Sequence, residues 1–75
     1  SKNDVFNELI LTGLRTIEGV NLAQLDAISP LDDKINKQID QFCSENLMEQ
    51  SNNSIRLTKI GRLQADRIAS DMFRV

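Results

Sequence analysis

The sequence predicts a single α+β domain, spanning residues 1–75, with four helices and a small antiparallel sheet. Three observations predict this class. Apolar residues recur at steps of three and four in four segments, two short alternating segments flank a polar turn, and one more short segment is rich in β-branched residues. A chain of 75 residues, of which 40% are hydrophobic, can bury one small core but not an enclosed cofactor cavity as well.

The first helix is predicted over residues 4–14, and either Asn3 or Asp4 can cap its start. Its apolar residues share one face: Val5, Phe6, Leu9, Ile10, Gly13 and Leu14. Residues 15–20 are predicted to form a short strand or an extended turn, because they contain β-branched residues, are too few for a helix and are interrupted by Gly19.

The second helix is predicted to begin at Asn21, with Gln24 in the spacing of a capping box. Ser29 is predicted to cap the third helix and Pro30 to take its first position, and the aspartates that follow suit the positive end of the helix dipole. Asn46 can take the left-handed conformation that ends this helix. The apolar positions of the two helices are Leu22, Leu25 and Ile28, then Leu31, Ile35, Ile39, Phe42, Cys43 and Leu47.

A β-hairpin is predicted from residues 47–50 and 55–57, around the polar turn at 51–54. Thr58 is predicted to cap a last helix with one apolar stripe: Gly61, Ala65, Ile68, Met72 and Val75. Since Gly61 has no side chain, a neighbouring backbone can approach it closely.

The order of these elements is helix, short strand, helix, helix, hairpin, helix, which is the plan of a winged-helix domain. The second and third helices are joined by a tight Ser-Pro turn, as in a helix-turn-helix. The first strand is expected to pair with the hairpin, because a two-stranded hairpin alone is only marginally stable. The sequence therefore predicts a winged-helix-like fold with a three-stranded sheet.

The charge argues against a general nucleic-acid binder, which needs many Lys and Arg contacts to phosphate. The net charge is −2 and the sequence pI is about 4.9. Residues 55–75 nevertheless hold five Lys or Arg against two acids, whereas residues 1–54 hold four against nine. The basic end is either a solvated helix face or a face that docks on an acidic partner.

A DNA-binding winged-helix regulator is the alternative function. Against it, Asp32 and Asp33 stand at the start of the third helix, where they would repel phosphate, and the turn at 51–54 has no Lys or Arg for a minor groove. No nucleic acid is therefore expected as a partner. The alternative predicts salt-dependent binding of duplex DNA that is lost when Lys34 or Lys37 is changed, and a titration at low salt tests it.

The sequence offers few groups for catalysis or metal binding. It has no histidine and one cysteine, so a triad hydrolase, a zinc finger or an iron–sulfur site made by this chain alone is not expected. Cys43 shares a helix face with apolar residues and is predicted to be a buried structural thiol. A haem-binding module with Cys43, Met48 or Met72 as a ligand is a third hypothesis, although both methionines suit core packing.

The chain has no apolar run near the roughly 20 residues that span a bilayer, and no signal-peptide pattern. The lone thiol fits a reducing compartment, so a cytoplasmic location without a membrane partner is expected. The chain begins at Ser1 rather than Met, and we expect it to be part of a longer protein.

A motif in residues 13–20, Gly-Leu-Arg-Thr-Ile-Glu-Gly-Val, supports a more specific hypothesis. Arg15 and Glu18 are predicted to form an ion pair that ties the end of the first helix to the first strand. Alternatively, the planar guanidinium of Arg15 reaches outside the domain, to a carboxylate on a neighbouring domain or a substrate.

This motif also resembles a known family. Together with Leu22, the motif is similar to the start of the C-terminal domain of oxygen-independent coproporphyrinogen III oxidase-like proteins. These are radical S-adenosylmethionine (radical SAM) proteins, and the family includes the related haem chaperones. A second similar block follows Leu47 and comprises Arg56-Leu57-Thr58-Lys59-Ile60-Gly61 and Ala65-Asp66-Arg67-Ile68. The resemblance covers about residues 8–73. Asn46 stands where the family often has glycine, and both residues suit a left-handed helix end.

The resemblance implies an accessory domain that is not catalytic by itself and that packs on a barrel of the same protein. In the family, the barrel precedes this domain, holds a [4Fe-4S] cluster on a Cys-x-x-x-Cys-x-x-Cys motif, and binds S-adenosylmethionine. This chain has no such motif, so these cofactors, or haem in the chaperones, are expected in the parent protein and not here. Oxidase-like members decarboxylate a porphyrinogen in haem biosynthesis, whereas chaperone-like members bind haem.

No catalytic, cofactor-binding or metal-binding residue of the family can be carried onto this chain. The motif residues with an expected structural or interdomain role are Gly13, Leu14, Arg15, Glu18, Gly19, Arg56, Leu57, Thr58 and Gly61. The expected docking face, on the basic last helix, comprises Lys59, Ile60, Arg62, Leu63, Arg67 and Phe73.

Overall fold

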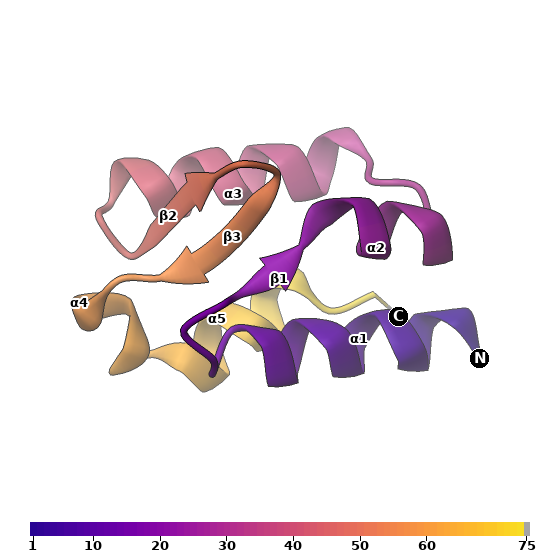
Figure 1. The fold of residues 1–75 in the computed structure, drawn as a ribbon, viewed down its shortest axis with the longest axis horizontal. Helices are drawn as coiled ribbons and strands as arrows, with labels where there is room; N and C mark the ends of the chain where they lie inside the picture. Colours follow the sequence, from indigo (N-terminus) through magenta and orange to yellow (C-terminus); the bar gives the residue numbers. More distant parts are fainter. Residues whose placement is uncertain (75) are drawn as a thin grey trace.

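The computed structural model describes residues 1–74 and shows five helices and a three-stranded antiparallel sheet within them (Figure 1). The α+β class and the order of the elements agree with the prediction, except that the last helix is divided in two. The elements are α1 (Lys2–Gly13), β1 (Val20–Asn21), α2 (Leu22–Ile28), α3 (Asp33–Ser44), β2 (Met48–Ser51), β3 (Ser54–Leu57), α4 (Lys59–Arg62) and α5 (Ala65–Met72).

The prediction of one continuous last helix was wrong at Leu63 and Gln64. Their backbone N–H groups donate to the carbonyls of Ile60 and Gly61, three residues back instead of four, at 3.2 and 2.9 Å. This tighter turn ends α4, and Gln64 has non-helical dihedrals before α5 begins. The predicted apolar stripe survives the break: Gly61, Ile68 and Met72 are buried and Ala65 is partly buried, while Val75 lies outside the described residues.

Two predicted helix starts were also wrong. Ser1 caps α1, not Asn3 or Asp4, because the Ser1 side chain accepts the N–H of Asp4 in a reciprocal capping box. Similarly, Asp32 caps α3, and its Oδ1 accepts the N–H of Ile35 at 3.0 Å.

Ser29, which was predicted to cap α3, instead ends α2 in an extended conformation with φ −154° and ψ 121°. The proline that follows favours this conformation, since its ring disfavours helical geometry in the preceding residue. Residues 30–31 then connect the two helices, and the N–H of Leu31 donates to Asp26 Oδ1 at 2.9 Å. The predicted cap at Asn21 is confirmed, because its side chain accepts the N–H of Gln24 at 3.0 Å.

The sheet has the order β1-β3-β2, so the first strand pairs with the hairpin as predicted. Val20 pairs with Ile55, and β1 is only two residues long, so most of residues 15–20 form a turn, which was the other predicted alternative. In the hairpin turn, Asn52 and Asn53 both have positive φ, 50° and 65°, as a type I′ turn requires.

The predicted left-handed end of α3 is confirmed at Asn46, whose φ is 62°.

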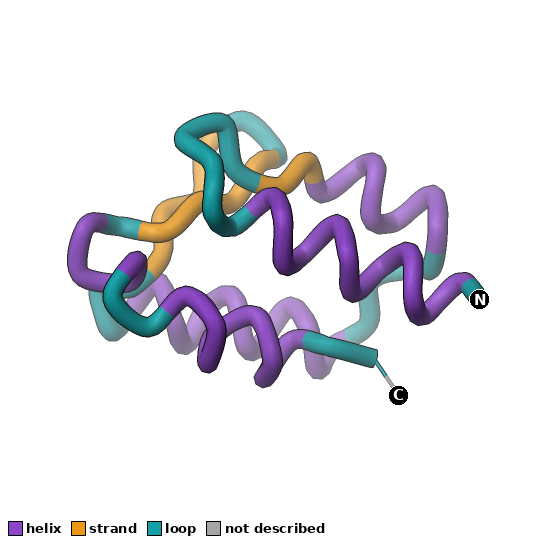
Figure 2. Tube along the Cα trace, turned by 90° about the horizontal axis from the view of Figure 1, so that it is seen from below, coloured by secondary structure: helices purple, strands orange, loops and turns teal. Residues whose placement is uncertain are grey.

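The core lies between α1 and α5 on one side and α3 with the sheet on the other. Figures 1 and 2 both show α5 alongside α1, with α3 on the far side of the molecule. No polar or charged residue among those described is buried. The buried apolar residues are Phe6, Ile10, Leu14, Val20, Leu22, Leu25, Ile35, Ile39, Phe42, Leu47, Met48, Ile55, Leu57, Ile68, Ala69 and Met72.

Arg74, at the end of the described chain, is hydrogen-bonded to Asn7 of α1. The Asn7 side chain donates to the Arg74 carbonyl at 2.7 Å and accepts the Arg74 N–H at 2.6 Å. The guanidinium carbon lies 4.6 Å from the centre of the Phe6 ring, and the guanidinium donates to the Pro30 carbonyl at 2.8 Å and to Asp32 at 3.3 Å. Arg74 therefore links α1 to the connection between α2 and α3.

Candidate functional site

The first motif block forms a tight turn between α1 and β1. Thr16 holds it together, because its hydroxyl donates to the Gly13 carbonyl at 2.9 Å and accepts the Gly19 N–H at 3.0 Å. Gly19 has φ +79°, and a Cβ there would lie 2.1 Å from the Ile55 carbonyl oxygen. Glycine is thus needed for the turn to approach β3. Leu14, in the same block, is buried in the core.

Arg15 pairs with Asp66 in the first turn of α5, and the predicted ion pair between Arg15 and Glu18 was wrong. The carboxylate that Arg15 meets is far away in the sequence and comes close only because α5 packs along α1. Glu18 instead lines a hollow near the hairpin with Glu49 and Arg56. Both members of the Arg15–Asp66 pair are exposed, so salt and water screen their interaction.

The second motif block fixes the start of α4 against the connection between α3 and β2. Thr58 Oγ1 accepts the N–H of Gly61 at 3.0 Å and donates to the Asn46 carbonyl at 2.7 Å. Gly61 lies so close to that connection that a Cβ would stand 1.9 Å from the Leu47 carbonyl oxygen. These residues have structural roles.

The strand residues of this block have separate roles. The Leu57 side chain is buried in the core. Arg56 points to solvent and forms a cross-strand pair with Glu49, in which its Nη2 lies 3.1 Å from Glu49 Oε2.

Most of the predicted docking residues gather where α4 turns into α5. A shallow hollow of about 550 Å³ lies there, and we call its lining residues the arginine corner: Arg15, Arg62, Leu63, Gln64, Ala65, Asp66 and Arg67. Lys59 and Ile60 precede it on α4, and both are exposed. The Leu63 side chain is 87% exposed and that of Ile60 52%. Arg15 could not be assigned to this group from the sequence, because only the fold brings it to α5.

Phe73, the remaining member of the predicted docking face, is not part of this corner. It is partly buried against the core and lines a different hollow with Asp32, Ile35 and Arg74. Figure 1 shows α4 at one end of the molecule and α5 leading away from it toward the C-terminus. The predicted face is therefore divided between two places.

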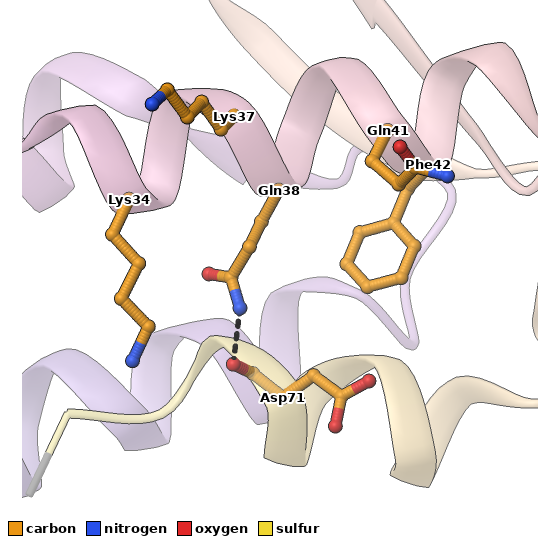
Figure 3. Close-up of a pocket in the computed structure, with 6 residues that line it drawn as sticks. All are labelled: Lys34, Lys37, Gln38, Gln41, Phe42 and Asp71. Atoms are coloured by element: carbon orange, nitrogen blue, oxygen red, sulfur yellow. Dashed lines mark hydrogen bonds between the residues drawn. The ribbon is translucent and has the colours of Figure 1, made fainter.

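A second surface, a groove of about 820 Å³ between α3 and α5, was not expected from the sequence (Figure 3). Gln38 crosses it, and its Nε2 donates to the Asp71 carbonyl at 2.6 Å, whereas its buried Oε1 has no partner among the described residues. The other lining residues are Lys34, Lys37, Gln41 and Phe42. No motif could have indicated this groove, because α3 and α5 are far apart in the sequence.

The candidate sulfur ligands lie in or against the core. Met48 and Met72 are buried, and the only cysteine, Cys43, is partly instead of fully buried. Burial raises the pKa of the Cys43 thiol, and the negative charge of Asp40 raises it further. A thiol with a raised pKa is a poor nucleophile and a poor metal ligand at neutral pH.

Within residues 1–74, no three or more His, Cys, Asp or Glu side chains are placed to share a metal ion. A [4Fe-4S] cluster held by three thiolates does not fit a chain with one cysteine. The helices of this described part are also too short or too polar to cross a lipid bilayer.

Comparison with known proteins agrees with the motif resemblance. A search of curated proteins and a search of solved structures gave no match, so the winged-helix likeness stays a prediction. The family described as the HemN C-terminal domain matches residues 1–63. This range includes the turn at Gly19 and extends to the end of α4, which contains Gly61. The chain therefore belongs to the HemN C-terminal domain family.

Proposed function

We propose that this chain is the C-terminal accessory domain of an oxygen-independent coproporphyrinogen III oxidase-like radical SAM protein, acting in haem biosynthesis or haem handling. In this proposal it packs on the catalytic barrel of the same cytoplasmic protein and catalyses nothing by itself. The observation that supports it most directly is the family match over residues 1–63, because this match covers the first motif block and the Arg56–Gly61 part of the second.

The side-chain inventory supports an accessory instead of a catalytic role. One partly buried thiol with a raised pKa cannot replace three cluster-binding cysteines, and the chain has no histidine to act as a general base. The cluster and S-adenosylmethionine would therefore belong to the barrel, where together they supply radical chemistry.

The exposed apolar side chains of the α4–α5 turn support a packing role. Ile60 and Leu63 are three residues apart in the sequence, at the end of α4. Both side chains are more than half exposed in this domain. An apolar surface of this kind is typical of a site that another protein surface covers.

The test is an anaerobic assay of the product encoded by the complete gene. We expect a Cys-x-x-x-Cys-x-x-Cys segment upstream of Ser1, and either porphyrinogen decarboxylation or haem binding by the complete product. A version without residues 1–75 should lose most of that function, and the 75-residue chain alone should show none. A complete gene without the cysteine segment, or turnover by the chain alone, would contradict the proposal.

A further inference from the structure

The arginine corner combines an apolar side chain in solvent with an excess of positive charge. Leu63 is the most exposed of the large hydrophobic residues described, at 87%. Its neighbours Arg62 and Arg67 are also exposed, and all three line the same hollow. An exposed leucine between two arginines is unfavourable in water but suits the centre of an interface, where the leucine is covered and the arginines lie around it.

Ion pairs among residues 1–74 do not balance the positive charge of the corner. Arg62 and Arg67 form no ion pair with any residue in the described part of the chain, while Arg15 shares its charge with Asp66. The corner thus has three guanidinium groups and one carboxylate, although the whole chain has a net charge of −2. An acidic surface would be attracted to this end of the molecule more strongly than to the molecule as a whole.

We propose that the arginine corner receives an acidic protein surface that has an apolar socket for Leu63 and carboxylates opposite Arg62 and Arg67. The inference rests on the proposed function, in which the partner surface belongs to the catalytic barrel. Carboxylates suit guanidinium groups because they accept two parallel hydrogen bonds. A nucleic-acid backbone suits the corner less well, since it would leave Leu63 uncovered and would be repelled by Asp66.

Asp66 gives the proposal a second consequence. The Asp66 carboxylate already forms an ion pair with Arg15. A partner carboxylate must therefore share the Arg15 guanidinium with Asp66 or displace Asp66 from it. Neutralising Asp66 should therefore strengthen the attraction between the corner and an acidic surface. A corner that served only the fold of this domain would not show this gain.

The test compares hydrogen exchange in the 75-residue chain with exchange in the complete gene product. The backbone amides of residues 59–67 should exchange about tenfold or more slowly in the complete product, and this protection should weaken as salt rises from about 50 to 500 mM. Two variants of the complete product, Arg62→Glu/Arg67→Glu and Leu63→Ser, should lose most of the protection. Asp66→Asn should increase it, because it frees Arg15 for a partner carboxylate.

The matched control is Lys34→Glu/Lys37→Glu, which reverses two exposed charges on the rim of the α3–α5 groove and should leave the protection unchanged. If protection in the complete product falls on the α3–α5 groove instead, the corner assignment is wrong but the accessory role stands. If no segment of the chain gains protection, the packing proposal itself fails. Binding of the isolated chain to phosphatidylserine vesicles, lost in the Leu63→Ser variant, would identify the partner as a membrane and overturn the inference.

Discussion

At the residue scale, Gly61 shows how closely two segments meet. A Cβ at this position would lie 1.9 Å from the Leu47 carbonyl oxygen, and a backbone atom cannot move aside as a flexible side chain can. Gly61→Ala should therefore destabilise the fold by about 1–3 kcal/mol or more, despite the better helix propensity of alanine. Thermal unfolding followed by circular dichroism measures the change. Ser70→Ala, at an exposed position of α5, is the control and should alter stability by less than about 0.5 kcal/mol.

Titration of the Asp32 carboxylate should affect the stability of the fold. The N–H of Ile35, with help from Arg74, holds its pKa below the ordinary value of 3.8 and outweighs the opposing effect of desolvation. A carboxylate whose pKa is lower in the folded state stabilises the fold above its unfolded pKa, and this contribution is lost as the pH falls through the folded value. Asp32→Asn keeps a capping oxygen but does not titrate.

We therefore expect urea unfolding between about pH 6 and pH 3 to show a shallower loss of stability for Asp32→Asn than for the original chain. Asp33→Asn is the control, because Asp33 makes no capping bond in α3. Equal pH dependence of the Asp32 variant and the original chain would show that the cap and Arg74 do not act through this charge.

At the scale of elements, the hairpin turn is well formed but not optimal. Asn52 and Asn53 both adopt positive φ, which asparagine tolerates and glycine adopts without strain. Asn53→Gly should stabilise the domain by a few tenths of a kcal/mol, whereas Asn53→Ala should destabilise it by about 1 kcal/mol. Urea unfolding of the two variants measures both effects, and opposite signs are the expected outcome.

The sequence predicted elements well where a local signal determines them. The Asn21 and Thr58 caps, the left-handed Asn46 and the pairing of the first strand were all predicted correctly, because each depends on nearby residues or on simple sheet stability. The start of α3 was predicted incorrectly because Ser29 and Asp32 are both good caps, and the effect of Pro30 on its predecessor favours Asp32. The break at Leu63 has no local sequence signal.

At the scale of the whole molecule, α5 supplies a part of the core that lies outside the family match. The match ends at residue 63, yet α5 supplies Ile68, Ala69 and Met72, each with no more than 1% of its surface exposed. A chain ending at Leu63 should therefore lose its cooperative thermal transition and its dispersed amide NMR spectrum. Arg74→Ala, which keeps α5 but removes the contacts to Phe6 and Pro30, should unfold cooperatively at a lower temperature. A cooperative transition in the shortened chain would contradict this account.

The candidate site was the least predictable feature, because its residues come together only in the tertiary structure. The basic character of the last helix could be predicted from composition, and so could the place of Leu63 on the expected docking face, outside the apolar stripe. The partner of Arg15 could not, since Asp66 and Glu18 are both plausible carboxylates and only the packing of α5 along α1 selects Asp66. The separation of Phe73 from the other docking residues has the same origin.

The strand order has a consequence for how the chain folds as it is synthesised. The central strand, β3, is the last strand to leave the ribosome. Val20 and Asn21 of β1 therefore cannot pair with β3 until α2, α3 and β2 have been synthesised. Likewise, Phe6 and Ile10 of α1 stay without part of their cover until α5 emerges. Because the hairpin joins neighbouring segments whereas α1 and α5 are far apart in the sequence, we expect the hairpin to form first and the docking of α1 against α5 to complete folding.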